Sequence, residues 1–209
     1  TFLSSILLHH KKFFVPTIRF ISFVKVYFIR HYSSLYLYYF NLKELIMNWK
    51  SGLLLHIHIA PIASAKMVEL NTAELVPGKG IVNDRYYNQN GSYSKIPDIR
   101  DVTLIENEVL DALASNQPPL QEKPIILKPI EHRRNLTTSG VPLNYLVGKK
   151  FQIGEVILKG GRLNFPCKYL ADLLKKPLVL PLYNRSGLNC SIEKGGIIKK
   201  GDKIIQLED

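Results

Sequence analysis

Cys167 is the residue of this 209-residue chain whose surroundings best suit a chemical role. It follows Pro166 in a segment that we expect to form a helix over residues 166–176. A cysteine in the first turn of a helix lies near free backbone N–H groups, and these favour a thiolate. A thiolate could attack sulfur, carry a persulfide or bind a soft metal such as molybdenum. The alternative is an inert thiol, because Cys167 shares one apolar helix face with Leu170 and Leu174.

Two clusters of polar residues could bind an anion. Arg133, Arg134 and Asn135 are expected to follow a strand and to precede a Thr-Thr-Ser-Gly loop. Two guanidinium groups and an amide suit a phosphate or the edge of a pterin, although a solvated charge pair would have the same sequence. Asp84 and Arg85 lie in a long polar loop, where the aspartate could orient an anion-binding arginine or cap a turn.

His56 and His58 alternate on a predicted strand, so their rings should lie on one face. A metal pair is one interpretation, but without a third ligand nearby a His-x-His pair is more typical of an ordinary strand. Cys190 lies in an apolar segment and is expected to be a core residue.

The composition limits the classes of function. Two cysteines make no disulfide framework and exclude four-cysteine zinc sites, so we expect a reducing, cytoplasmic compartment. The net charge of +11 suggests a polyanionic partner, but +5 of it comes from residues 1–46. The remainder is only mildly basic and has no RNA-binding motif or zinc finger, so we expect no nucleic-acid partner.

Residues 1–46 differ in composition from the rest of the chain. They contain seven of the nine phenylalanines, no glycine and no alanine. Arg19, Lys25 and Arg30 interrupt the stretch, so we expect no membrane span. Upstream sequence read as protein and an organellar targeting segment both remain open. In either case the segment is expected to be an extension, followed by one domain over residues 47–209.

The rest of the chain predicts many short strands and few helices. Strands are expected at 53–60, 68–76, 102–105, 125–130, 151–159 and 203–207, and helices at 106–114, 142–147 and 166–176. This order indicates a mostly-β, β-barrel-like fold with a few short helices.

Seven motifs in order resemble the MOSC family, named for the C-terminal domain of molybdenum cofactor sulfurase. They are His58-Ile59-Ala60-Pro61 with Met67, Gly80-Ile81-Val82-Asn83-Asp84-Arg85-Tyr86, Val102-Thr103-Leu104-Ile105-Glu106, Arg133-Arg134-Asn135-Leu136, Phe151-Gln152-Ile153-Gly154, Gly161-Arg162 with Pro166-Cys167-Lys168-Tyr169-Leu170, and Arg185-Ser186-Gly187-Leu188 before Gly201-Asp202. The resemblance spans residues 54–207. Asn83 and Ser186 depart from it, since the family often has glycine at both positions.

The resemblance implies a MOSC-type barrel that binds molybdenum cofactor (molybdopterin), with Cys167 as molybdenum ligand or sulfur carrier. Arg133, Arg134 and Asn135, with Asp84, Arg85 and Arg185, would then hold the phosphate and the pterin. Some single-domain relatives look like molybdenum-dependent reductases of N-hydroxylated compounds, which would need a redox partner. The alternatives are a carrier without turnover and a small anion- or RNA-binding barrel. The chain has no room for a pyridoxal-phosphate domain, so sulfur would come from a separate cysteine desulfurase.

Overall fold

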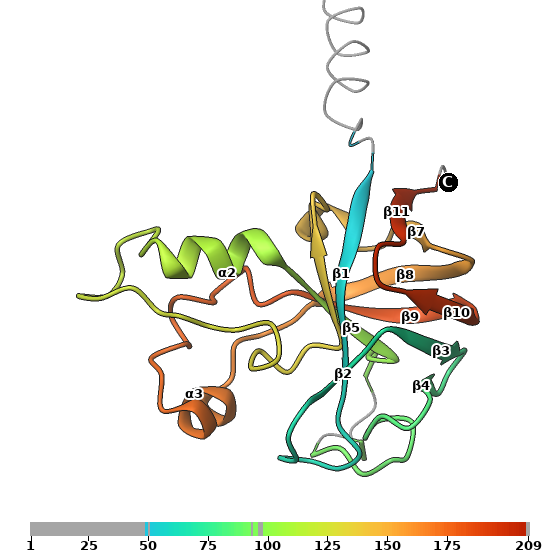
Figure 1. Cartoon of the computed structure of the whole chain (residues 1–209), viewed down its shortest axis with the longest axis horizontal. Helices are drawn as coiled ribbons and strands as arrows, with labels where there is room; N and C mark the ends of the chain where they lie inside the picture. The colour runs from blue at the N-terminus through green and yellow to red at the C-terminus, as the bar shows by residue number, and fades with distance from the viewer. Residues whose placement is uncertain (1–48, 50, 93, 96–97, 208–209) are drawn as a thin grey trace, which may run out of the picture. The chain divides into compact units, whose positions relative to one another are not determined.

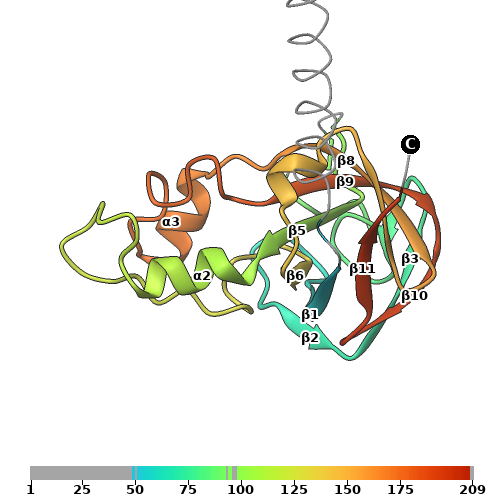
Figure 2. The ribbon, with the colours of Figure 1, turned by 90° about the horizontal axis from the view of Figure 1, so that it is seen from above.

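A computed structural model describes residues 49, 51–92, 94–95 and 98–207 of the chain, and these form one compact unit. Seven strands close into a barrel because β1 pairs with β11, with Gly52 opposite Ile204 (Figures 1 and 2). Around the barrel the order is β11 (Lys203–Gln206), β7 (Lys150–Ile153), β8 (Val156–Leu163), β9 (Leu188–Lys194), β5 (Val102–Glu106), β6 (Leu136–Ser139) and β1 (Gly52–Ile59). The predicted mostly-β barrel is confirmed.

The number of strands in the barrel requires at least one parallel pair of neighbours. An odd number of strands cannot alternate in direction around a closed ring, so at least one neighbouring pair must be parallel. That pair is β5 and β6, with Leu104 opposite Leu136, and the other neighbours are antiparallel. The parallel pair brings the start of β5 beside the segment that leads into β6, and this segment contains the Arg133-Arg134-Asn135 motif.

Shorter elements complete the fold. Strand β2 (Val68–Leu70) pairs with the end of β1, while β10 (Gly196–Lys199), β3 (Thr72–Val76) and β4 (Gly80–Ile81) form a small second sheet. The helices are α2 (Asn107–Ala114), the 3-10 turn η1 (Leu143–Leu146) and α3 (Lys168–Leu174). No helix in the described part of the chain is both long and apolar enough to cross a membrane.

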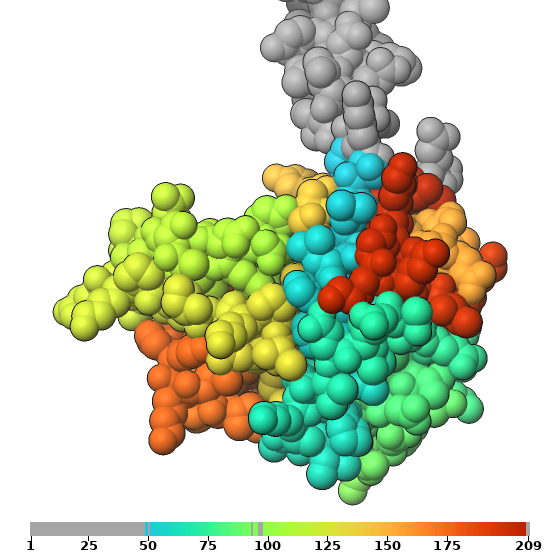
Figure 3. Space-filling view, viewed as in Figure 1, coloured from blue at the N-terminus to red at the C-terminus, as the bar shows by residue number. Residues whose placement is uncertain are grey.

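Two apolar clusters hold these elements together. The first fills the barrel, where alternating residues such as Val156 and Leu158 of β8 are buried and Lys159 is exposed. The second joins α2 and α3, which lie on the same side of the barrel in Figures 1 and 3, through residues such as Leu110 and Leu170. Cys167 packs against this second cluster, so its position depends on the contact between the helices.

Two sequence predictions were wrong. The strand expected at 125–130 does not form: Ile125 and Leu127 are buried in the second cluster, and the amide of Ile125 donates to the carbonyl of Leu113 at 3.0 Å instead of to a strand. The Thr-Thr-Ser segment, expected to be a loop, is strand β6, with Thr137 and Thr138 fully buried.

Two other expected strands are each divided. Residues 68–76 form β2 and β3, and residues 151–159 form the antiparallel hairpin of β7 and β8. The hairpin turns at Gly154, whose φ of +54° lies in the left-handed region that glycine enters without steric cost.

Candidate functional site

One pocket of about 260 Å³ opens between the barrel and α3. Five arginines line it, together with the thiol of Cys167, and the lining residues include no aspartate or glutamate. The arginines are Arg85, Arg100, Arg133, Arg134 and Arg162. Such a density of guanidinium groups around a small cavity suits a ligand with an anionic group such as phosphate.

Cys167 is half-buried at the wall of this pocket. It is the N-cap of α3, with φ −125° and ψ 145°, so it lies one residue before the first turn in which we expected it. Pro166 correspondingly precedes the N-cap and does not occupy the first helical position. The backbone amides of the first turn still begin directly after Cys167, so the thiol remains beside the positive end of the helix.

Arg134 is held more firmly than a solvent-exposed arginine would be. Its Nε donates to the Ser186 carbonyl at 2.9 Å, and its two terminal nitrogens donate to the Ser186 hydroxyl at 2.6 Å and to the His132 carbonyl at 3.2 Å. Burial lowers the pKa of Arg134 to about 10, and Cys167 acts in the opposite direction. The guanidinium therefore stays charged at neutral pH and contributes a fixed positive charge to the pocket. Ser186 supplies two of the three acceptors, and its hydroxyl is one that a glycine at this position would lack.

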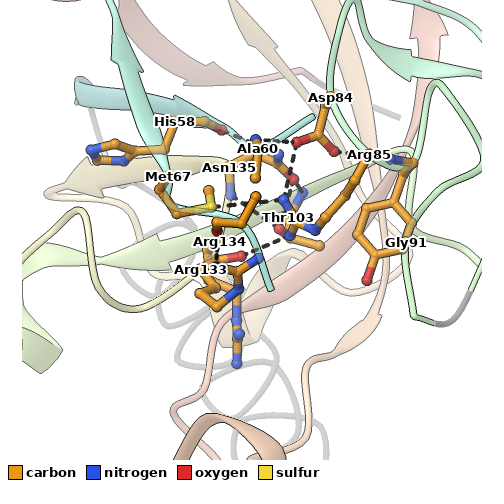
Figure 4. A network of polar contacts seen from close by, with 12 residues as sticks. His58, Ala60, Met67, Asp84, Arg85, Gly91, Thr103, Arg133, Arg134 and Asn135 are labelled. Atoms are coloured by element: carbon orange, nitrogen blue, oxygen red, sulfur yellow. Dashed lines mark hydrogen bonds and ion pairs between the residues drawn. The ribbon is translucent and has the colours of Figure 1, made fainter. Parts of the chain in front are cut away.

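Arg133 and Arg85 are linked through the backbone (Figure 4). Arg85 donates to the Arg133 carbonyl at 3.1 Å, and Arg133 donates to the Ala65 carbonyl at 2.7 Å. Arg133 has a φ of +62°, an uncommon conformation for a side chain of this size. The arrangement turns two consecutive arginines toward the same pocket from one short segment.

Asp84 and Asn135 are buried and do not line the pocket. Asp84 pairs with Arg85 at 3.0 Å and accepts the backbone amide of Ala60 at 3.0 Å. Asn135 accepts the amide and hydroxyl of Thr103 at 3.2 and 2.8 Å (Figure 4). These two residues position the arginines and the strands that carry them. Asn83 adopts a φ of +67°, so the left-handed backbone that a glycine would supply is kept.

Arg185 is not brought to this pocket. Its Nε donates to the carbonyl of Pro181 at 2.6 Å, and another nitrogen donates to that of Gln117 at 2.8 Å. Both acceptors are backbone atoms, so Arg185 ties the loop before β9 to the loop after α2.

Two arginines of the pocket were not predicted to bind the ligand. Arg162 on β8 and Arg100 both pair with Asp98, Arg100 at 2.7 Å. Arg100 also lies 6.0 Å from the ring of Tyr86, whose other neighbour is Arg85 at 4.8 Å. Arg162 could have been assigned from its place shortly before Cys167 in the chain, but nothing in the sequence around Arg100 distinguishes it from a loop residue.

His132 lies between Arg134, which lines the pocket, and His58 on β1. Its Nδ1 accepts the amide of Arg134 at 2.9 Å, and its Nε2 contacts the Thr137 hydroxyl at 2.8 Å. Its ring also meets that of His58 edge-on at 5.9 Å. Burial, followed by the nearby charge of Arg134, lowers the pKa of His132 well below its usual 6.5. The ring of His132 is therefore neutral in the folded protein at neutral pH.

We expect the free energy of unfolding to fall as the pH drops below about 6.5, because unfolded His132 takes up a proton that the folded protein excludes. The slope from this residue is up to about 1.4 kcal/mol per pH unit. Urea titrations at pH 7 and pH 5, in buffer containing a chelator, measure it. His132→Gln should have a shallower slope, and equal slopes in the two proteins would contradict the assignment.

Comparison with known protein families identifies the family of this domain. The model of the MOSC domain family matches residues 94–205, more than half of the chain. The chain therefore belongs to the MOSC domain family. No curated protein matches the sequence as a relative.

Solved structures share the fold. YuaD from Bacillus subtilis is 18% identical with a TM-score of 0.62, over 76% of this chain and 97% of that one. YiiM from Geobacillus stearothermophilus is 12% identical with a TM-score of 0.57, over 75% of each chain. YiiM from Escherichia coli is 16% identical with a TM-score of 0.55, over 76% of this chain and 70% of that one. Identities this low establish the fold alone.

Proposed function

We propose that this chain binds the molybdenum cofactor in the arginine-lined pocket and uses Cys167 as molybdenum ligand or sulfur carrier. The observation that carries the proposal is the meeting of one thiol with five arginines around a single cavity. Membership of the MOSC family, which is associated with this cofactor, supports the same conclusion.

The residues of the pocket fit the chemistry of the cofactor at both ends. A phosphate suits charge-assisted hydrogen bonds from arginine, and a thiolate is a ligand that molybdenum accepts. Arg133 and Arg162 would bind the anionic end, while Arg134 would contribute charge from its fixed position beside Cys167. Bound there, the cofactor would supply a redox-active metal. Asp84 and Asn135 would act through the residues they position.

Two activities are compatible with such a site. The protein could reduce N-hydroxylated compounds with electrons from a redox partner, or it could carry cofactor or sulfur to another enzyme without turnover. A persulfide on Cys167 would require sulfur from a separate pyridoxal-phosphate-dependent cysteine desulfurase. An assay of amidoxime reduction by the cofactor-loaded chain separates the two: turnover identifies the reductase, and its absence in loaded protein identifies the carrier.

The proposed domain comprises residues 47–209. Trp49 packs against the barrel core, so a chain that begins at Met47 keeps this contact. We expect chains beginning at Thr1 and at Met47 to have the same melting temperature for the domain and the same cofactor content. If the shorter chain fails to fold, the boundary is wrong.

Arg162→Ala should weaken retention of the cofactor by about 10- to 150-fold, the equivalent of one charge-assisted hydrogen bond. The side chain of Arg162 is 39% exposed, and Asp98 keeps its pairing with Arg100, so the fold should tolerate the change. Dialysis followed by measurement of bound pterin tests this. Arg134→Ala is a poorer probe, because it also leaves the Ser186 carbonyl and hydroxyl without their donors.

Arg185→Ala is the matched control for Arg162→Ala. Arg185 also binds two protein oxygens but lies outside the pocket, so its loss should leave retention unchanged. Equal retention by both variants would favour the alternative in which the arginines of this barrel serve only structure or a general anion.

A further inference from the structure

Three metal-ligating side chains meet on the outer face of the barrel where β1 pairs with β2. They are His56, His58 and Glu69, and one ligand atom from each lies within 4.8 Å of the others. His56 and His58 share a face because they are two residues apart on β1, and their rings stack at 5.8 Å. Glu69 lies directly opposite His58 in the antiparallel register. The third ligand therefore comes from a different strand, and the spacing of the histidines gave no sign of it.

His58 is the unusual member of the group. It is only 1% exposed, and neither ring nitrogen has a hydrogen-bond partner among the described residues. A buried imidazole whose nitrogens have no partners is unfavourable, because it loses its hydrogen bonds to water and gains none in return, and folded proteins rarely retain one without a reason. In Figure 4 its ring points away from the arginine network, toward the opposite side of β1. The unpaired nitrogens thus point to a ligand outside the pocket.

The other two ligands are accessible. The side chains of His56 and Glu69 are 29% and 38% exposed, and His56 Nδ1 donates to Glu69 Oε1 at 2.8 Å. None of the three lines the pocket that contains Cys167. The charged or titratable groups that face them are Lys200, which donates to Glu69 at 2.6 Å, and the ring of His132 beside His58.

We propose that His56, His58 and Glu69 form a binding site for a divalent transition-metal ion of the zinc class. Two imidazoles and one carboxylate suit such an ion, whereas calcium and magnesium prefer oxygen ligands alone. Three protein ligands leave a fourth position for water or another small ligand. Bonds of about 2.0–2.2 Å place tetrahedral ligand atoms roughly 3.4 Å apart, so the half-buried side chain of His56 and the exposed side chain of Glu69 must approach His58 slightly.

Lys200 provides a test that simple loss of stability cannot imitate. Its ammonium group binds the carboxylate oxygen that also accepts from His56, so it competes with a cation for Glu69. Removing this group should tighten metal binding, by about two- to fivefold if the exposed pair has ordinary strength. Lys199, its neighbour on β10, is exposed and forms no ion pair with Glu69 in the structure, so Lys199→Met is the matched control.

The experiment is a titration of the full chain with Zn²⁺ against a chromophoric chelator. All proteins carry Cys167→Ser, so that the thiol of the pocket does not bind zinc. Histidines 9, 10 and 31 are common to all of them, so the differences in affinity isolate the proposed site. A Co²⁺ spectrum of the same proteins reports directly on nitrogen and oxygen coordination.

We expect about one zinc ion per chain in this background. His58→Ala and Glu69→Gln should weaken it by about 10- to 100-fold or more, since loss of even an outer partner of a metal ligand has effects of that size. Lys200→Met should tighten it, and Lys199→Met should leave it unchanged. Unchanged affinity in Glu69→Gln, an exposed substitution that should not disturb folding, would overturn the proposal, as would unchanged affinity in Lys200→Met. The result is independent of whether the pocket binds the molybdenum cofactor.

Discussion

A Cys167→Ser variant is expected to keep its fold and to lose molybdenum-dependent activity or sulfur transfer. Serine has nearly the size of cysteine, but its hydroxyl is a far poorer sulfur nucleophile and soft-metal ligand. Cys167 is half-buried at the pocket wall, so the change should alter stability by only about 1 kcal/mol. The melting temperature and the activity of one preparation measure both effects.

Cys190 is the matched control for Cys167. It is fully buried in the barrel, and burial raises the pKa of its thiol far above the usual range. Iodoacetamide at neutral pH should therefore modify Cys167 much faster than Cys190 in the folded protein. A Cys167→Ser protein that is destabilised yet fully active per folded molecule would show that the thiol is structural.

Gly187→Ala is expected to destabilise the protein by more than about 4 kcal/mol, or to prevent folding. Gly187 has a φ of +104°, and a Cβ placed on it would lie 1.9 Å from the carbonyl oxygen of Leu104 on β5. The residue before it, Ser186, holds Arg134 through two hydrogen bonds. The close approach of Gly187, the residue before β9, to Leu104 on β5 thus constrains both the barrel and the position of Arg134 in the pocket.

Gly201→Ala separates this steric effect from backbone strain alone. Gly201 has a similar φ of +87°, but an added Cβ would meet nothing within 4 Å. The expected loss is therefore only the cost of a left-handed alanine, about 1–2 kcal/mol. Urea denaturation of both variants gives the comparison. Equal shifts in midpoint would mean that the approach of Gly187 to Leu104 does not limit stability.

The sequence predicted the elements that local patterns determine. Strand β1 and helix α2 were placed within a residue or two, because apolar periodicity and turn residues mark them. Residues 125–130 and β6 were misassigned for one shared reason. Ile125 is a β-branched residue typical of strands, but it packs against the helices of the second cluster. The polar Thr137 and Thr138 form a barrel strand because β1 and β5 lie on either side of them. Pairing between distant segments is not encoded in the local pattern.

The candidate site was predicted in part for a similar reason. Cys167, Arg85, Arg133 and Arg134 meet in one pocket, whereas Arg185 binds elsewhere. Asn135 was expected to touch the ligand, but it is buried and holds Thr103. Arg100 joins the site only because its loop folds back toward Tyr86 and Asp98. Residue type indicated the chemistry, while the tertiary fold determined which residues of that type were brought together.

The pocket around Cys167 is proposed to bind the molybdenum cofactor. The most direct measurement is the molybdenum and pterin content of the full chain purified from a host that makes this cofactor. We predict molybdenum and pterin in comparable amounts approaching about one per chain, with both reduced in Arg162→Ala and unchanged in Arg185→Ala. Folded protein from that host with neither molybdenum nor pterin would contradict the claim.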